Sequence, residues 1–479
     1  MVELPALDPS EAPRARRWDA LILGSGLAAL VAAARIGAAG QRVLIVEEGA
    51  RATLPPALKE PFFLAGLRDE GVLDACLKTL SVPLIDRRRL AAERLAFQIA
   101  ADPVRIDIGQ AAVTAEELVA WGLAKPEEAQ TLVREMLESS KVERSVLLES
   151  PVVRVGRRAA GGRPPQIGHH RRGLPGIVGT LAGPLPALLA AQIRALSNLG
   201  LGAPPPESQA RLLGVPLAGG VGFADEPPWL YDLLRKRVAA SYGDFRTLNG
   251  DFDLVAVSGQ PGVRVRKTGE IWLGRTLVIA AAPSALRDHY GAEAALAPEG
   301  ASAAAPARPV PSILSRGGSR AFRVAFLFSV PTAVLPEGMS ARLILPEQDA
   351  DHPTTAITAF PSQTHAQRVD LVARAVVADR DPERLARVRR GIATRLRDLM
   401  PFCKDSLAVM TVEMPRWDGD DGWLEDPQPG LGWPSEIDLR ISARPSVYHL
   451  DRAAVAALGF EGDLLLGWRG GDAIAAELG

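Results

Sequence analysis

A glycine-rich turn near the beginning of the chain has the residue types and the spacing that a diphosphate-binding site requires. The turn follows the pattern G-x-G-x-x-A and consists of Gly24, Ser25, Gly26, Leu27, Ala28 and Ala29. In such a turn the first glycine permits a tight bend, the second lets a pyrophosphate approach the backbone, and the small last residue allows a helix to pack closely on a strand. The unpaired N–H groups that begin the helix favour an anion. The turn therefore predicts a dinucleotide site.

Two acidic residues follow at the distance where a dinucleotide would place its ribose. Glu47 and Glu48 end an apolar run at residues 43–46, about 20 residues beyond the turn. A carboxylate there can accept hydrogen bonds from an adenosine ribose, whether the nucleotide is FAD or an NAD(P) cofactor. Residues 19–48 are accordingly expected to form strand, helix and strand. The alternative is an alanine-rich helix docked on a sheet, whose glycines serve packing alone.

Composition limits the other classes of function. The chain has 479 residues, with 55 Lys and Arg against 56 Asp and Glu, and this balance argues against nucleic acid as a partner. Cys76 and Cys403 lie far apart, and the adjacent His169 and His170 have no acidic or thiol cluster beside them. No metal site is therefore expected. The N-terminal residues lack an apolar signal segment, and a reducing, cytoplasmic location is expected.

The turn and two further regions resemble a known family. Residues 19–48 resemble the N-terminal FAD-binding unit of the amine oxidase and phytoene desaturase superfamily, a fold shared with Rab GDP-dissociation inhibitors. The family's G-x5-N-x2-V-x2-[IV] pattern, whose backbone contacts adenine, is matched by Gly243, Asn249, Phe252 and Val255, with Phe252 in place of the first Val. The strand that runs through Ala281 into Pro283 also resembles the family's next strand. The resemblance implies FAD as cofactor.

The C-terminal segment resembles the strand and helix that close onto the flavin, but it departs from the family in detail. A strand is expected at residues 463–466, followed by a short helix at 473–478. The family's Gly-Asp motif after this strand is replaced by a segment in which the expected cofactor contacts are Gly467, Trp468, Arg469, Gly471 and Asp472. The family's Gly-Gly-Arg motif after the acidic residue is also missing from residues 49–55.

The expected fold class is α/β, with a Rossmann-like FAD-binding domain of the three-layer ββα type and a second domain of mixed sheet plus helices. Residues 1–18 are expected to be a polar tail. The FAD-binding domain would be discontinuous and take residues 19–60, 212–290 and 445–479. The substrate domain would take residues 61–211 and 291–444. Within these, residues 57–150 are expected to be mostly helical, and residues 365–399 to form two helices.

One segment raises the question of a membrane. Residues 154–193 begin with several arginines and continue into an apolar stretch interrupted by prolines. A regular membrane-spanning helix is a poor interpretation because proline disrupts helices. One interpretation is a loop that leads into a buried or surface-lying helix at residues 185–199. The alternative is peripheral contact with an anionic membrane surface.

These features favour an FAD-dependent oxidoreductase of the desaturase or amine oxidase type. Its small-molecule substrate would be apolar or an amine, and would lie between the two domains. No side chain is identified as a catalytic acid or base, which is compatible with a flavin performing the hydride chemistry. The alternative is a catalytically degenerate subunit that binds a lipid, a partner protein or a paralogue. The missing Gly-Gly pair and the short last helix favour that alternative.

Overall fold

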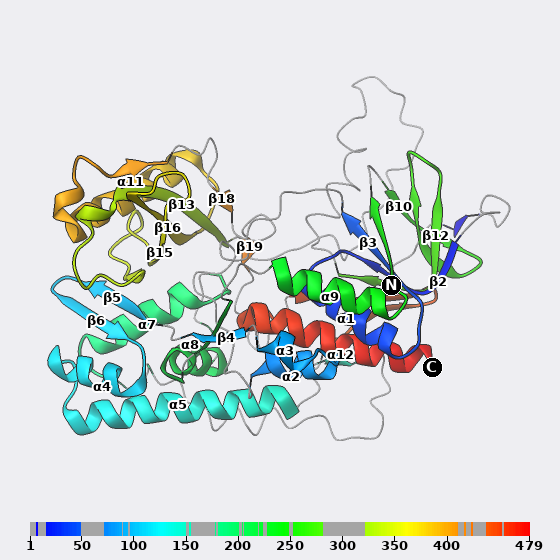
Figure 1. Ribbon diagram of the computed structural model, residues 1–479, viewed down its shortest axis with the longest axis horizontal. Coiled ribbons are helices and arrows are strands. Elements are labelled where there is room, and N and C mark those ends of the chain that lie inside the picture. The colour runs from blue at the N-terminus through cyan, green and yellow to red at the C-terminus, as the bar shows by residue number, and fades with distance from the viewer. Residues whose placement is uncertain are drawn as a thin grey trace.

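A computed structural model describes residues 6–7, 16–48, 71–88, 90–93, 96–149, 153–154, 178, 181–200, 204, 206–218, 220–223, 228–248, 252–280, 321–410, 416–417, 423–424, 437–452 and 455–479. These residues form two large mixed sheets, each with its own helices (Figure 1). Two short strand pairs lie outside the large sheets. They are β4 (Leu90–Glu93) with β8 (Gly220–Phe223), and β7 (Val153–Arg154) with β20 (Ile437–Asp438).

The first sheet is built around parallel strands. Its order is β1 (Ala6–Leu7), β10 (Phe252–Val257), β11 (Gln260–Val265), β12 (Ile271–Ile279), β2 (Arg16–Leu23), β3 (Val43–Glu48) and β9 (Asp244–Leu248). Strands β12, β2, β3 and β9 run parallel, and β22 (Ser446–His449) joins β12 in the same direction. Strand β21 (Arg440–Ala443) pairs with β22, whereas β10, β11 and β12 form an antiparallel meander.

The two faces of the parallel strands are covered differently. One face shares a core with helices α1 (Leu27–Ala38), α2 (Val72–Thr79), α9 (Pro228–Ala240) and α12 (Phe460–Leu478), of which α1 lies directly on β2 and β3. Side chains of the other face, such as Leu21 and Leu44, share a core with Phe252 and Val263 of the meander. Helices, parallel strands and meander therefore form three layers, and the expected Rossmann-like fold class is confirmed.

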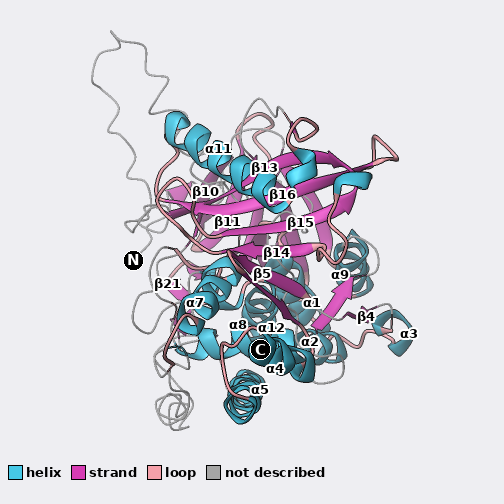
Figure 2. Ribbon diagram, turned by 90° about the vertical axis from the view of Figure 1, so that its left-hand side faces the viewer, coloured by secondary structure: helices cyan, strands magenta, loops and turns pink. Residues whose placement is uncertain are grey.

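The second sheet is largely antiparallel. Its order is β17 (Ala408–Val409), β13 (Ala321–Pro331), β16 (Arg368–Val377), β15 (Thr355–Pro361), β14 (Arg342–Leu345), β5 (Phe97–Ala101) and β6 (Val104–Ile108), with β18 (Arg416–Trp417) and β19 (Trp423–Leu424) also paired to β13. Helix α11 (Pro382–Leu399) covers one face. The other face meets a helical layer of α4 (Ala111–Ala120), α5 (Pro126–Glu149), α7 (Leu185–Leu196) and α8 (Pro206–Ala218) (Figure 2).

Short helices complete the described chain. They are α3 (Leu84–Arg87) and the 3-10 turns η6 (Thr332–Val334), η7 (Pro401–Cys403) and η9 (Ala456–Leu458).

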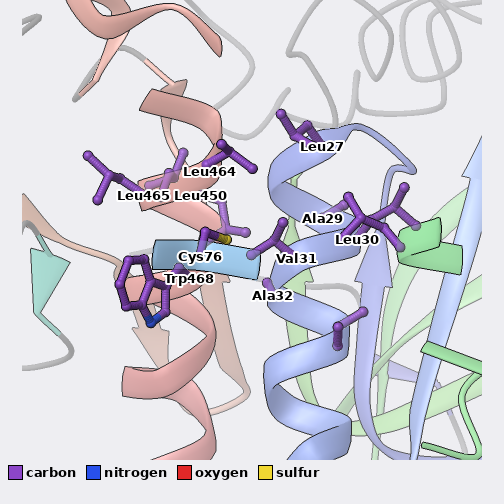
Figure 3. Packing of buried hydrophobic residues seen from close by; sticks show 14 of the residues in the cluster. Leu27, Ala29, Leu30, Val31, Ala32, Cys76, Leu450, Leu464, Leu465 and Trp468 are labelled. Atoms are coloured by element: carbon purple, nitrogen blue, oxygen red, sulfur yellow. The ribbon is translucent and has the colours of Figure 1, made fainter. Parts of the chain in front are cut away.

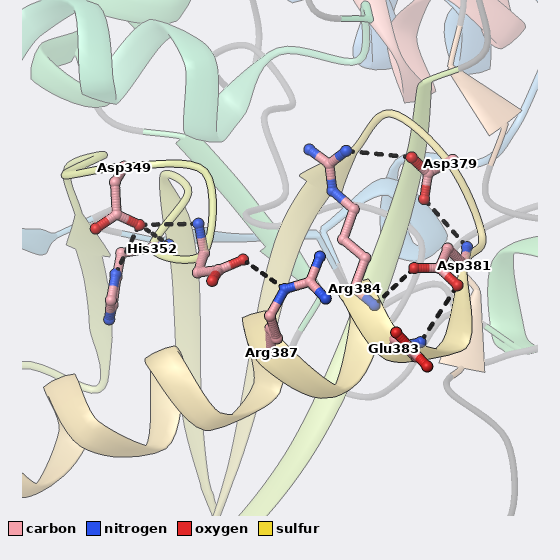
Figure 4. A network of polar contacts seen from close by, with 8 residues as sticks. Asp349, His352, Asp379, Asp381, Glu383, Arg384 and Arg387 are labelled. Atoms are coloured by element: carbon pink, nitrogen blue, oxygen red, sulfur yellow. Dashed lines mark hydrogen bonds and ion pairs between the residues drawn. The ribbon is translucent and has the colours of Figure 1, made fainter.

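The start of α11 is closed by its own side chains. The Asp381 carboxylate accepts hydrogen bonds from the backbone N–H of Glu383 at 3.4 Å and of Arg384 at 3.0 Å (Figure 4). The Arg384 side chain in turn donates to Asp379 at 3.1 Å. These contacts satisfy N–H groups that the first turn of a helix leaves without an intrahelical partner. The helix start is thus fixed by local polar contacts within the protein.

Several expectations about local structure are wrong. Strand β1 and the first residues of β2 lie within residues 1–18, which were expected to be a tail. Residues 368–377 form β16 where a helix was expected. By contrast, the described part of residues 57–150 is mostly helical as expected, although it also contains the hairpin of β5 and β6. At the C-terminus, residues 463–466 are helical rather than extended, because α12 is one continuous helix of 19 residues. The domain boundaries themselves remain a prediction.

Helix α7 lies in the segment that raised the question of a membrane. Its large apolar side chains, including Leu188, Leu189 and Ile193, are buried in the core beneath the second sheet. This part of the segment therefore follows the interpretation as a buried helix. The basic residues at 155–172 lie outside the described residues. In the part of the chain that is described, no helix is long and apolar enough to cross a bilayer.

Candidate functional site

The glycine-rich turn connects β2 to α1 as the sequence predicts. Gly24 directly follows β2, has φ +115° and donates its N–H to the carbonyl oxygen of Val46 on β3 at 2.9 Å. That φ is readily adopted only by glycine. Gly24 thus lets the chain leave the sheet and enter α1 through Ser25 and Gly26, and it binds the turn to the neighbouring strand.

Within the described residues, the N-terminus of α1 has no capping side chain. Its N-cap is Gly26, which has no side chain, and its first turn has no acidic residue. The first hydrogen bond along the helix runs from the Leu30 N–H to the Gly26 carbonyl at 3.0 Å. The N–H groups of residues 27–29 precede that bond and point out of the helix end. Their side chains are buried or half-buried, so the backbone faces outward here and can receive an anion.

Gly26 is a glycine that the protein's own packing does not require. It is exposed and has an extended backbone with φ −66° and ψ 176°, which other residues adopt readily. A Cβ atom added to it would meet no described protein atom within 4 Å. Among the described residues, the space in front of the helix end is therefore open, and a diphosphate could fill it. The residues present therefore fit a bound dinucleotide.

The open helix end lies at an edge where several strands finish together. Ile279, the last residue of β12, is in register with Leu23 of β2 on one side and with His449 of β22 on the other. Because these strands are parallel, their carboxyl ends meet at one edge, beside the turn at Gly24. Ligands of open α/β sheets bind outside this edge. The topology thus places the turn where a nucleotide is expected.

Glu47 lies at the same edge, at the end of β3, and is held by a basic residue. Arg235 of α9 contacts both carboxylate oxygens of Glu47: its Nη1 contacts Oε1, and its Nη2 lies 3.4 Å from Oε2. The Arg235 guanidinium also lies over the ring of Phe245 on β9, 4.3 Å from the centroid. Glu47 therefore lies at the edge where it was expected to contact the ribose. It also has an ion-pair partner, Arg235, that the sequence did not reveal.

The other expected contacts of the central region are only partly described. Phe252 begins β10, and its side chain is fully buried in the core between parallel strands and meander. Only its backbone therefore remains for a ligand, as the resemblance implies. The side chain of Glu48 is not among those described, and Ala281, Asn249 and residues 49–55 lie outside the described residues.

The five expected contacts near the C-terminus lie along the crossing of α12 with α1. A Cβ atom on Gly467 would be 2.5 Å from the Ala28 carbonyl oxygen, and one on Gly471 would be 2.9 Å from the Ala32 Cα. These two glycines let the helices run side by side in the same direction (Figure 3). Gly467 is thus beside the first turn of α1, whereas Gly471 is one turn further along.

The other three expected contacts have side-chain partners within the protein; they are Trp468, Arg469 and Asp472. Trp468 is buried in the helical core, and the Arg469 guanidinium lies 4.1 Å from its ring centroid. Arg469 also donates to the carbonyl of Leu148 at 2.8 Å, and Asp472 forms an ion pair with Arg35 of α1 at 2.5 Å. The cofactor contacts assigned to these residues remain a prediction.

Cys76 of α2 is packed beside this crossing (Figure 3). Burial raises the pKa of its thiol to about 12, an effect that the nearby Arg35 opposes. The thiol is therefore protonated at neutral pH and does not serve as a nucleophile. Among the described residues no cluster of His, Cys, Asp and Glu could hold a metal ion.

Asp451 is a candidate site residue that the sequence reasoning missed. The last strand of the sheet is β22, not residues 463–466, and it is followed by Leu450 and Asp451. The Leu450 N–H donates to the Ile279 carbonyl at 2.9 Å, so Asp451 leaves the sheet at the edge occupied by the glycine-rich turn. The family's Gly-Asp motif follows the closing strand, and Leu450-Asp451 occupies that place here. The sequence signal that could have identified Asp451 was the run Val447-Tyr448-His449 directly before Leu450-Asp451.

No family model matches the chain, and no curated protein matches it. Solved structures do match, and at 13–14% identity they show the fold alone: the chain shares its fold with solved structures of putrescine oxidase.

Among individual proteins, it is similar to putrescine oxidase. A redesigned variant has a TM-score of 0.51 at 14% identity, covering 96% of this chain and 99% of that one. The wild type bound to putrescine gives 0.50 at 13%, covering 96% and 100%. A Rab GDI from Plasmodium falciparum gives 0.46 at 12%, covering 95% and 98%.

Proposed function

We propose that the protein is an FAD-dependent oxidoreductase of the desaturase or amine oxidase type. The observation that carries this proposal is the N-terminus of α1 at the carboxyl edge of a parallel sheet, where no described side chain caps the helix and no described atom fills the space at Gly26. A helix end with free N–H groups attracts a diphosphate, and this edge is where α/β sheets bind nucleotides.

Residues of this chain can be given roles toward the cofactor. The N–H groups of residues 27–29 would bind the diphosphate, and Glu47 would accept hydrogen bonds from the adenosine ribose. Asp451, at the adjoining strand end, would bind the chain that carries the flavin. Bound FAD would supply a hydride acceptor, and the protein would bind and orient the substrate.

The substrate class is proposed on likeness alone. The matched putrescine oxidase is described as bound to putrescine, an amine, and the resemblance to desaturases suggests an apolar molecule. We propose an apolar compound or an amine, taken up between the two sheets.

The non-catalytic alternative has lost part of its basis. The last helix is a full 19 residues long, so it is not shortened. An acidic residue, Asp451, follows the closing strand, although the preceding glycine is replaced by Leu450. The missing Gly-Gly pair in residues 49–55 remains the one departure that favours a degenerate subunit. Enzymatic function is therefore the better proposal.

The test is whether purified protein binds FAD at this helix end. We expect flavin absorption bands in the purified protein or after incubation with FAD, and FAD in the supernatant after denaturation. Gly26→Ala should weaken FAD binding by about tenfold or more, because the new methyl group takes the space of a diphosphate whose charge-assisted hydrogen bonds are each worth about 1.5–3 kcal/mol.

Gly109→Ala is the matched control. A Cβ atom there would make an ordinary contact of 3.8 Å with Ala96. This variant should bind FAD like the wild type and should unfold at the wild-type temperature when no ligand is present. A wild-type protein that takes up no FAD, or equal affinity in Gly26→Ala, would contradict the proposal.

A further inference from the structure

The ion pair between Glu47 and Arg235 lies where the ribose of a bound nucleotide would be. Glu47 ends β3, which is parallel to β9, and Arg235 reaches it from α9, the helix that leads into β9. The guanidinium addresses both carboxylate oxygens, with Nη1 on Oε1 and Nη2 3.4 Å from Oε2. This is the two-pronged arrangement for which the planar guanidinium is suited.

A ribose diol needs the same oxygens. The 2′- and 3′-hydroxyl groups are neighbouring donors, and a carboxylate can accept one of them on each oxygen. A guanidinium that contacts both oxygens already takes one of the two lone pairs on each. Arg235 and a ribose diol that approaches both oxygens from the same side therefore compete for Glu47.

Arg235 is the partner that can leave. Its side chain is 39% exposed, whereas that of Glu47 is 18% exposed. The guanidinium also lies 4.3 Å from the centroid of the Phe245 ring, a contact that does not depend on the carboxylate. Cation–π contacts of this kind stabilise a guanidinium near an aromatic face. Arg235 can thus leave Glu47 for solvent while its side chain keeps a neighbour.

We propose that Arg235 is a specificity-determining residue of the nucleotide site, which masks Glu47 and lowers the preference of the site for a ribose with free 2′- and 3′-hydroxyl groups. The ion pair must open before the two ribose hydroxyl groups can donate hydrogen bonds to the Glu47 carboxylate. This inference rests on the proposed nucleotide-binding function.

The test compares two ligands that carry the same diphosphate. ADP and 2′,3′-dideoxy-ADP differ only in the two hydroxyl groups, so the ratio of their affinities isolates the ribose contact from attraction between phosphate and protein charges. Affinities are measured by calorimetry on the full chain, freed of bound nucleotide. In Arg235→Gln the preference for ADP should rise by about two- to fivefold over wild type, the range expected for losing a partly exposed ion pair.

Two variants serve as controls. Arg237→Gln removes a positive charge from the same helix, at a residue whose guanidinium donates to the Leu80 carbonyl at 3.1 Å, and it should leave the ratio unchanged. Glu47→Gln should lower the ratio below the wild-type value, both alone and combined with Arg235→Gln, because the ribose then loses its carboxylate.

The outcomes separate this inference from the function on which it rests. A ratio that falls in Arg235→Gln would show that Arg235 holds Glu47 in place for the ribose, and an unchanged ratio would show no competition. Either result overturns the inference while nucleotide binding stands. Absence of ADP binding in wild type and all variants overturns both. ADP binding that appears only in Arg235→Gln supports the inference.

Discussion

The first turns of α1 and α11 present two solutions to one problem. Each helix begins with N–H groups that have no partner within the helix. In α11, Asp381 accepts two of these N–H groups, and Glu383 adds negative charge to the first turn (Figure 4). In α1 the cap is a glycine, without a capping side chain or a first-turn acid. The difference separates a helix end completed by the protein from one suited to a ligand.

The largest expected effect comes from giving α1 the cap that α11 has. Gly26→Asp places a carboxylate at the N-cap, where it can accept the free N–H groups and repel a diphosphate. We expect nucleotide affinity to fall by about 100-fold, since charge-assisted hydrogen bonds of about 1.5–3 kcal/mol each are lost. Stability without ligand should stay level or rise by a few tenths of a kcal/mol. Calorimetric titration measures the nucleotide affinity, and thermal unfolding measures the stability. A nucleotide affinity equal to that of the wild type would show that the α1 helix end does not bind the diphosphate.

A second prediction contrasts Gly26 with a glycine that the packing does require. A Cβ atom on Gly467 would lie 2.5 Å from the Ala28 carbonyl, whereas one on Gly26 would meet no described atom within 4 Å. Gly467→Val should therefore destabilise the fold by about 2–3 kcal/mol, as overpacked positions do. Denaturant unfolding measures this loss. Gly26→Ala, as the control, should cost only about 1 kcal/mol or less, the difference between glycine and alanine as N-cap residues.

A third helix, α2, has an acidic residue, Asp74, in its first turn, and substitution of this residue measures what a charge in the first turn contributes to stability. Asp74 is buried, and it contacts Lys78 at 2.5 Å and Arg87 at 2.7 Å. Burial raises the pKa of the Asp74 carboxyl, but hydrogen bonds from Lys78 and Arg87 outweigh burial and hold this pKa below its usual value. Asp74→Asn should cost about 1.5 kcal/mol at pH 7, mainly through Arg87, because Lys78 is half exposed.

The pH dependence of this loss follows from the direction of the shift. A carboxyl whose pKa is lowered in the folded protein stabilises the fold above its unfolded pKa, and loses this contribution as the pH falls through the folded value. The difference between wild type and Asp74→Asn should therefore be constant near neutrality and shrink below about pH 4. Unfolding free energies across this range provide the measurement. A difference in unfolding free energy that persists at strongly acidic pH would show that Asp74→Asn acts through packing and not through the charge of the carboxylate.

The smallest effect is expected at the capped helix. Asp381→Ala removes the acceptor of the Glu383 and Arg384 N–H groups and should cost about 1 kcal/mol of stability. Nucleotide affinity should not change, because α11 covers the second sheet, not the edge at Gly24. Thermal unfolding with and without ADP distinguishes the two effects. A matching fall in ADP affinity would show that α11 and the nucleotide site are coupled.

The part of the site nearest the N-terminus could be predicted because its signals are local. Gly24 needs a positive φ, the alanine-rich run favours a helix, and the apolar run before Glu47 suits a strand buried on both faces. Each signal depends on residues within a few positions of one another. The β2–α1–β3 unit therefore follows from short-range pattern, and the structure confirms it.

The C-terminal half of the site depends on partners distant in sequence. Gly467 and Gly471 are poor helix formers, and the apolar run at residues 464–466 suited a strand equally well. What favours the helix is close packing against Ala28 and Ala32, which the local sequence does not reveal. Placing the last strand at residues 463–466 then concealed Asp451, and the Arg235 contact with Glu47 was equally hidden because 188 residues separate the pair.

The pairing of β12 with both β2 and β22 has a consequence for when the site comes into existence. Leu23 and His449 flank one strand, and the ion pair of Arg35 with Asp472 joins residues 437 positions apart. Such distant pairings form late and slowly compared with local ones. A ribosome-bound chain ending before β22 would lack the strand end that lies beside the glycine-rich turn, so tight nucleotide binding would require a molecule whose C-terminal residues have folded.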